Sequence, residues 1–314
     1  MSLDPGTEMK RPSYKYFLRG VLKCLTLSVF VLFFLYICKV GLDLQTCDVG
    51  EVNHAHMKRA QMFARDVLQA QCRPDFAKNE MGRLFKDRYS KDLSCFVKRD
   101  DVLNDSMYKF RPPFGFRNNL DDLENLLEIM PEDSLPKGLE SKNCKRCIVV
   151  GSGGILHGLD LGQSIDQFDI VIRLNNAPIQ GFSTSVGNKT TIRMTYPEGA
   201  PFSEKEYIPN SLFVTVLFKN ADFRWLQAVL KNESLSAWNR LFFWKRVPVK
   251  LPLSSTQFRI LNPLIVKETA FDVLKYPEPQ RKWLGWEKNV PTIGGGGGAY
   301  AVACDGSYSG NASL

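Results

Sequence analysis

The chain begins with a long apolar segment whose two flanks differ in charge. Val21 to Val40 are twenty residues with one lysine near each end, enough helix to cross a hydrocarbon layer about 30 Å thick. Basic residues precede the segment and acidic residues follow it, which predicts a signal anchor with a cytoplasmic N-terminus and a luminal C-terminus. The alternatives are a cleaved signal peptide and a buried core helix. Against them, no small-residue cleavage site follows Val40, and the segment has no polar face.

Shorter periodic segments follow the apolar one. Apolar residues recur at helical spacing over 54–71, which predicts a first helix that packs on the domain at the end of a polar stem. Two prolines and a glycine interrupt the chain over 111–116. Residues 120–130 then predict a short amphipathic helix, which ends before Pro131.

From Cys147 the pattern changes to buried strands that alternate with helices. Strands are predicted over 148–150, 168–174, 211–218 and 258–261, and helices over 222–230 and 267–275, with a further helical segment after the first strand. Such alternation is typical of an α/β domain built on a parallel sheet.

The turn after the first strand has the composition of a phosphate-binding loop. Gly151, Ser152 and Gly153 follow the strand directly, and Asn175 ends the second strand. Glycines let the backbone approach a phosphate, and N–H groups at a helix start attract the anion. Ligand groups gather at the carboxyl ends of parallel strands. The spacing differs from the dinucleotide-binding fingerprint, so a turn of purely structural function is the alternative.

Charge and cysteine content bear on partners and compartment. The net charge of +8 is spread along the chain without an arginine-rich run, so nucleic acid is not expected as a partner. Six cysteines follow the apolar segment and would pair in an oxidising lumen, with the pairing left open. Four sequons make N-glycosylation candidates of Asn104, Asn188, Asn232 and Asn311.

Aromatic residues cluster in the second half of the chain. Trp238, Phe242, Phe243 and Trp244 lie close together, and Trp283 and Trp286 follow later. We expect them in the core, and a surface that faces sugar or membrane is the alternative.

Three segments together resemble the large sialyl motif of animal sialyltransferases, glycosyltransferase family 29. They are 147–178, 187–191 and 196–198, and the resemblance extends from the apolar segment through Gly294. It is greatest with members that act on lactosylceramide. The resemblance implies a Rossmann-like GT-A variant sheet without cofactor or metal, in a single-pass type II protein of the Golgi membrane. It further implies transfer of sialic acid from CMP-sialic acid, with inversion, to the terminal galactose of a glycolipid such as lactosylceramide in an α2,3 linkage, as in GM3 synthesis.

Individual positions carry this resemblance to the donor site. Asn175 matches the asparagine that contacts the nucleotide, and Gly294 matches the glycine that opens the small sialyl motif near the donor phosphate. Ser152, between Gly151 and Gly153, replaces an asparagine that relatives often have. In the family Cys147 pairs with a later cysteine, for which Cys304 is the candidate, close to the family register.

The resemblance ends after Gly294. Residues 294–298 are all glycine, which cannot sustain the helix that the family has there. The family's catalytic histidines lie in C-terminal motifs, and none of His54, His56 and His157 occupies those positions. We therefore name no catalytic residue, read His157 as a structural or solvated side chain, and expect a truncated or alternative product with little or no transferase activity.

The predicted organisation follows from these segments. It is a cytoplasmic tail over 1–20, an anchor over 21–40, a stem and first helix over 41–110, a partial sialyltransferase domain over 111–294, incomplete at its C-terminus, and a divergent glycine-rich tail over 295–314. One alternative is a non-catalytic regulatory isoform that dimerises with the full-length enzyme or assembles with other Golgi transferases. Another is a different transferase, or an error in the sequence itself.

Overall fold

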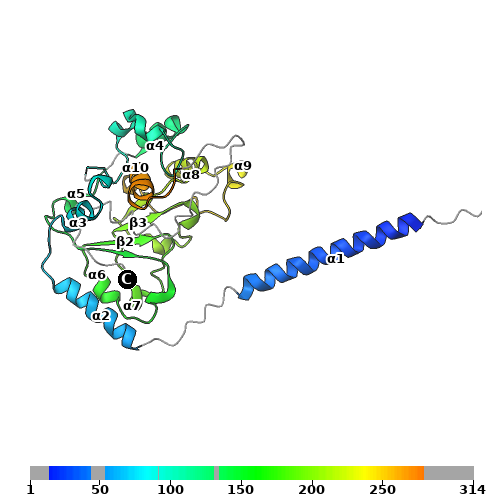
Figure 1. Cartoon of the computed structure of the whole chain (residues 1–314), viewed down its shortest axis with the longest axis horizontal. Coiled ribbons are helices and arrows are strands. Elements are labelled where there is room, and N and C mark those ends of the chain that lie inside the picture. The colour runs from blue at the N-terminus through cyan, green and yellow to red at the C-terminus, as the bar shows by residue number, and fades with distance from the viewer. Residues whose placement is uncertain (1–13, 44–53, 91, 131–133, 279–314) are drawn as a thin grey trace, which may run out of the picture. The chain divides into compact units, whose positions relative to one another are not determined.

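The structure is a computed structural model that describes residues 14–43, 54–90, 92–130 and 134–278. The chain forms two compact units, residues 1–51 and residues 52–314. In the first unit Tyr14–Asp43 form one helix, α1 (Figure 1). Among the described residues, no helix combines the length and the apolarity that crossing a membrane requires. The anchor predicted over 21–40 is not confirmed.

The second unit alternates strands with short helices. Its α-helices before the sheet are α2 (His54–Gln69), α3 (Phe76–Phe85), α4 (Leu120–Ile129) and α5 (Lys137–Glu140). The strands are β1 (Cys147–Val150), β2 (Ile170–Leu174), β3 (Ile192–Thr195), β4 (Leu212–Thr215) and β5 (Phe258–Ile260). Between and after them lie α6 (Gly162–Asp166), α7 (Ser183–Val186), α8 (Asn220–Leu230), α9 (Ala237–Arg240) and α10 (Pro263–Lys267).

Single helical turns complete the described part of this unit. They are η1 (Lys86–Arg88), η2 (Arg99–Leu103), η3 (Asp105–Tyr108), η4 (Gly154–Leu156), η5 (Pro197–Gly199), η6 (Glu204–Glu206), η7 (Ser255–Gln257) and the π-helical η8 (Glu268–Val273). The helix predicted over 267–275 begins earlier than predicted, at Pro263, and continues into η8. It begins there because the Asn262 side chain caps it by accepting a hydrogen bond from the Leu264 N–H.

The strands form one parallel sheet in the order β1-β2-β3-β4-β5. All four predicted strands are present: β1 begins one residue earlier than predicted, and the other three are shorter than predicted. The α/β fold with a parallel sheet is confirmed. β3 was not predicted. It lies between β2 and β4, where Arg193 is paired in register with Arg173 of β2 and with Phe213 of β4.

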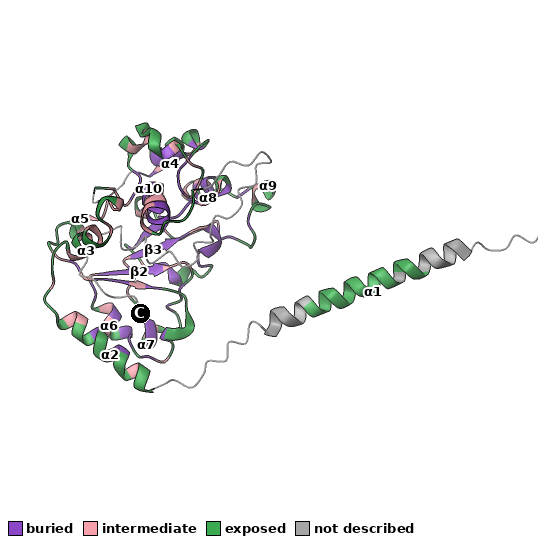
Figure 2. Ribbon diagram, viewed as in Figure 1, coloured by how far each residue is buried: buried purple, intermediate pink, exposed green. Residues whose placement is uncertain are grey.

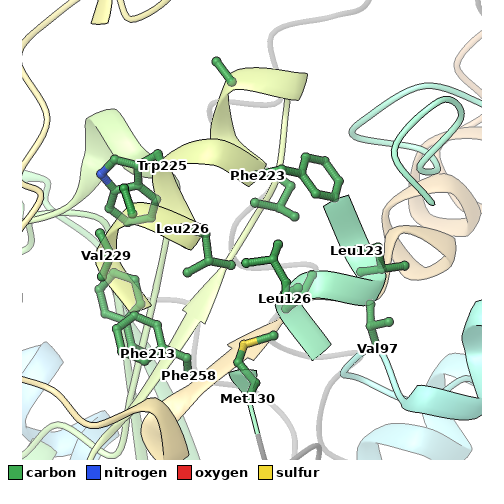
Figure 3. Close-up of a cluster of buried hydrophobic side chains, with 14 of the residues drawn as sticks. Val97, Leu123, Leu126, Met130, Phe213, Phe223, Trp225, Leu226, Val229 and Phe258 are labelled. Carbon is green, nitrogen blue, oxygen red and sulfur yellow. The ribbon is translucent and has the colours of Figure 1, made fainter. Parts of the chain in front are cut away.

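The sheet is buried on both faces, as alternation along β4 shows. Phe213 belongs to one apolar cluster with Leu126 of α4 and Trp225 of α8 (Figure 3). Its neighbours Leu212 and Val214 belong to another, which includes residues of α3 and α10. Figure 2 shows the buried strands between outer helices that are exposed on one side. Helices on both faces explain why the strands are nearly continuous apolar runs.

A disulfide joins Cys72, just after α2, to Cys144, just before β1. α2 also packs its buried Ala60 and Ala64 against Ile148 of β1, in a third apolar cluster. The bond therefore closes a loop of 72 residues between α2 and the edge strand β1, which restricts the unfolded chain. Cys147 is buried at the start of β1. Its predicted partner Cys304 lies outside the described residues, so that pairing stays a prediction.

The expectation that the aromatic cluster lies in the core is wrong for three of its members. Trp238, Phe242 and Trp244 are 70%, 56% and 72% exposed, whereas Phe243 is buried. α9 is only four residues long, so it has too little surface to bury every large side chain near it. Trp283, Trp286, Gly294 and the tail over 295–314 lie outside the described residues.

Candidate functional site

The glycine turn lies at the carboxyl end of β1, where all five parallel strands end at the same edge. Gly151, Ser152 and Gly153 are exposed, and a Cβ on either glycine would meet no described atom within 4 Å. The backbone here is open to a ligand. A 3₁₀ turn, η4, follows the glycines, and the first α-helix, α6, begins only at Gly162. The helix start expected directly after the turn is therefore a single 3₁₀ turn.

Asn175 lies directly after β2, next to that turn, in a left-handed conformation with φ 52°. Its N–H donates to the Met194 carbonyl at 2.9 Å, and its Oδ1 accepts from the Thr195 hydroxyl at 3.3 Å. Gly199 approaches so closely that a Cβ there would lie 2.6 Å from Asn175 Oδ1. Asparagine tolerates this backbone conformation, and β3 holds its side chain at the edge of the sheet.

A buried ion pair fixes the backbone after Asn175. Arg193 of β3 is 2% exposed, and its Nη1 donates to the carbonyls of Asn175 at 2.7 Å and Ala177 at 3.2 Å. Its Nη2 lies 3.4 Å from Glu206 Oε2, and the Glu206 carboxylate accepts from the Ile179 N–H at 3.0 Å. Burial lowers the pKa of Arg193, and Glu206 opposes that shift. The pair therefore positions residues 175–179.

Arg173 is the fully buried partner of Arg193 on β2. Its Nη2 donates to the Val186 carbonyl at 2.7 Å, and its Nε donates to the Thr190 hydroxyl at 3.0 Å. Burial, together with the charge of the nearby Arg193, lowers the pKa of Arg173 to about 10. The sequence did not predict that Arg173 and Arg193 are buried and hold the structure together, because an arginine within a strand is usually expected to face solvent.

A second charged cluster lies where β3 and β4 end. Lys219 Nζ is 2.7 Å from Glu198 Oε1 and 3.0 Å from Asp222 Oδ1, and both carboxylates are fully buried. Asp222 also accepts hydrogen bonds from the Phe218 and Lys219 N–H groups, which begins α8. Burial raises the pKa of Asp222 to about 6, although Lys219 acts to lower it. Sequence reasoning named Glu198 only as part of a motif and missed the other two.

Lys219 also lines a cavity of about 480 Å³ at the start of α8. Its described lining includes the basic residues Arg111, Lys219 and Arg224, and no acidic side chain. The remaining lining residues are Pro112, Phe218, Asn220, Ala221, Asn239 and Phe242. A cavity of this size and charge suits a small anionic ligand.

Comparison with known proteins identifies the family of this site. The sequence profile of glycosyltransferase family 29 (sialyltransferase) matches residues 96–305. The chain belongs to glycosyltransferase family 29. Human lactosylceramide alpha-2,3-sialyltransferase is 55% identical over 92% of this chain and 69% of that protein. Mouse CMP-N-acetylneuraminate-beta-1,4-galactoside alpha-2,3-sialyltransferase is 40% identical over 71% of this chain and 58% of that protein.

The fold agrees with a solved member of the sialyltransferases. A mammalian sialyltransferase crystallised in complex with Gal-beta-1-3GalNAc-ortho-nitrophenol matches with a TM-score of 0.53 and 25% identity, over 66% of this chain and 78% of that chain. The resemblance drawn from the large sialyl motif is thereby confirmed at the level of family and fold.

The predicted site residues divide into two groups in this sialyltransferase domain. The structure brings Gly151, Ser152, Gly153 and Asn175 together at the ends of adjacent strands. Gly294 and the sequon at Asn311 lie outside the described residues. The other sequon residues, Asn104, Asn188 and Asn232, are exposed, as glycan attachment requires. His157 is also exposed, with its ring 5.8 Å from that of Phe182.

Titration of Asp222 should leave a signature in stability. Its folded pKa of about 6 lies above the ordinary 3.8, so the folded state holds the proton more tightly. The resulting stabilisation is present below pH 4 and is lost as the pH rises through 6. Asp222→Asn keeps an oxygen acceptor without the charge. We expect the free energy of unfolding of the variant, relative to that of the unsubstituted chain, to rise by about 2–3 kcal/mol between pH 4 and pH 7.

Urea denaturation at several pH values within that range measures this difference. Asp121→Asn is the matched control, because Asp121 is an exposed aspartate in the first turn of α4. It should show no comparable pH-dependent change. A flat difference curve for Asp222→Asn would contradict the raised pKa.

Proposed function

We propose that this domain belongs to a sialyltransferase that uses CMP-sialic acid as donor and the terminal galactose of a glycolipid such as lactosylceramide as acceptor. The α2,3 linkage of GM3 synthesis is part of the proposal. The observation that carries it is the identity of 55% over 92% of the chain with the human lactosylceramide enzyme. The mouse enzyme named for β1,4-galactosides is less similar, at 40% over 71%.

The described residues supply groups suited to the donor. The open backbone at Gly151–Gly153 suits a phosphate, and the amide of Asn175 suits a nucleotide hydroxyl or base. Arg111 and Arg224 add positive charge in the cavity at the start of α8, whereas the charge of Lys219 is paired with Glu198 and Asp222. That these 314 residues transfer sialic acid slowly or not at all stays a prediction, as does a regulatory role.

Donor binding can be tested without catalysis. Asn175→Gly removes the side-chain amide and tolerates positive φ, so we expect CMP binding, measured by calorimetric titration, to weaken about tenfold with the fold intact. Asn210→Gly is the control, because Asn210 is exposed with φ 63° outside this site. Equal CMP affinities of the two variants would contradict a donor role for Asn175.

Acceptor choice needs a separate assay. The chain is incubated with CMP-sialic acid and either lactosylceramide or N-acetyllactosamine, and turnover like that of the human relative would contradict the predicted inactivity. Residues 1–293 are also joined to the C-terminal segment of each relative named above. A preference of both chimaeras for lactosylceramide would support the proposed acceptor, and a preference that follows the grafted segment would contradict it.

We also propose the Golgi membrane as the location, with the C-terminus luminal. Support comes from the apolar run over 21–40 with its basic flank, from the exposed sequons, and from the Cys72–Cys144 disulfide, which suits an oxidising compartment. Retention in the membrane fraction after alkaline extraction, together with removal of glycans by an N-glycosidase, is the expected result. A fully extractable, unglycosylated chain would contradict this location.

A further inference from the structure

An exposed surface of mixed aromatic and basic residues lies at α9 and the loop that follows it. We call it the α9 surface, and its members are Trp238, Arg240, Leu241, Phe242, Trp244 and Lys245. Leu241 is 73% exposed, and Trp238 and Trp244 are exposed to nearly the same extent. Single exposed apolar residues are ordinary, but four large ones within seven residues indicate an interaction surface.

The fold holds this segment from below. Leu235, Phe243 and Val247 are buried in the same apolar cluster as α8. Arg224 of α8 donates to Asn239 Oδ1 at 3.3 Å, so α8 and α9 lie side by side (Figure 1). Trp225 Nε1 donates to the Pro248 carbonyl at 2.6 Å, which fixes the end of the loop. The outward aromatic side chains are therefore displayed on a supported segment.

The charged residues within this segment of the sequence have one sign. From Ser234 to Lys267 the sequence contains no aspartate or glutamate. Lys245 Nζ lies 4.9 Å from the centre of the Trp244 ring, and the Arg246 guanidinium lies 5.5 Å from that of Phe202. Tryptophan and leucine beside lysine and arginine match the boundary between lipid headgroups and acyl chains, and the cations match anionic headgroups.

We propose that the α9 surface binds a lipid bilayer that contains anionic lipids, with Trp238, Leu241 and Trp244 at the headgroup boundary. This inference concerns membrane contact and stands without the transfer reaction. Phe242 belongs both to this surface and to the wall of the cavity at the start of α8. Bound lipid would thus lie beside the cavity, which, if the proposed function holds, brings a glycolipid headgroup to it.

Local quenching by lipid tests the contact in the full chain. An environment-sensitive fluorescent amino acid replaces Leu241 in one variant and Leu103 in another, in vesicles of phosphatidylcholine and phosphatidylserine that contain brominated lipid. Leu103 is 87% exposed and lies beside Asp100 and Asp101. We expect quenching at position 241 to be about threefold stronger than at position 103. The site-specific readout separates this contact from any other attachment of the chain to the vesicle.

Charge variants complete the test. Lys245→Glu with Arg246→Glu, or vesicles of phosphatidylcholine alone, should reduce the quenching at position 241 about twofold or more. Equal quenching at positions 241 and 103 would overturn the proposal. So would a fluorescence shift at position 241 that grows with protein concentration and is insensitive to brominated lipid, since that would assign the surface to a second copy of this chain.

Discussion

Replacing Arg193 with methionine is expected to lower the free energy of unfolding by about 3–5 kcal/mol. The substitution keeps an apolar stem of similar length but leaves the Glu206 carboxylate buried without its cation. It also removes the donors to the carbonyls of Asn175 and Ala177. Urea denaturation of the purified chain measures the loss. We further expect weaker CMP binding, because the backbone that carries Asn175 loses its support.

Two companion variants separate charge from packing. Glu206→Gln should destabilise the unsubstituted chain yet restore part of the stability of Arg193→Met, because it removes the uncompensated charge. Arg83→Met removes an exposed arginine whose partner is Glu80, one turn away on α3, and should leave stability unchanged. A small loss of stability for Arg193→Met, or the absence of any rescue by Glu206→Gln, would contradict the claim that this buried pair stabilises the fold.

The Arg193–Glu206 pair also explains why β3 was not predicted, because Arg193 lies within that strand. β1 and β4 have no charged residue, and the apolar run of β2 outweighs its single arginine, so each stood out from its neighbours. β3 consists of Ile-Arg-Met-Thr, in which an arginine and a threonine conceal a strand that is buried throughout. Asn175 was placed correctly because it follows an apolar strand. Arg193, which donates to the Asn175 carbonyl, and Glu206, the ion-pair partner of Arg193, were not found, since their contacts exist only after β3 has entered the sheet.

Other features depended on packing that local patterns do not record. The pairing of Cys72 with Cys144 depends on α2 lying against β1, so sequence left many pairings open. Phe243 and Trp244, which follow α8, are adjacent aromatic residues that the sequence pattern does not distinguish. Phe243 turns inward and Trp244 outward because the short α9 and its loop expose one side only.

Substituting Trp225 and Trp238 tests the difference between buried and exposed aromatic residues, because the two are the same residue type in opposite surroundings. Trp225 is fully buried and packs near Phe213 (Figure 3). Its Nε1 also donates to the Pro248 carbonyl. Trp225→Ala should cost about 3–5 kcal/mol in the free energy of unfolding, measured by circular dichroism in urea, whereas Trp238→Ala should cost less than about 0.5 kcal/mol.

Hydrogen exchange over 236–246 should accelerate in Trp225→Ala alone, because the loop then loses its hydrogen bond to α8. Similar losses of stability in the two variants would show that the α9 surface belongs to the core of the domain, and would contradict both the burial described here and a surface displayed toward lipid.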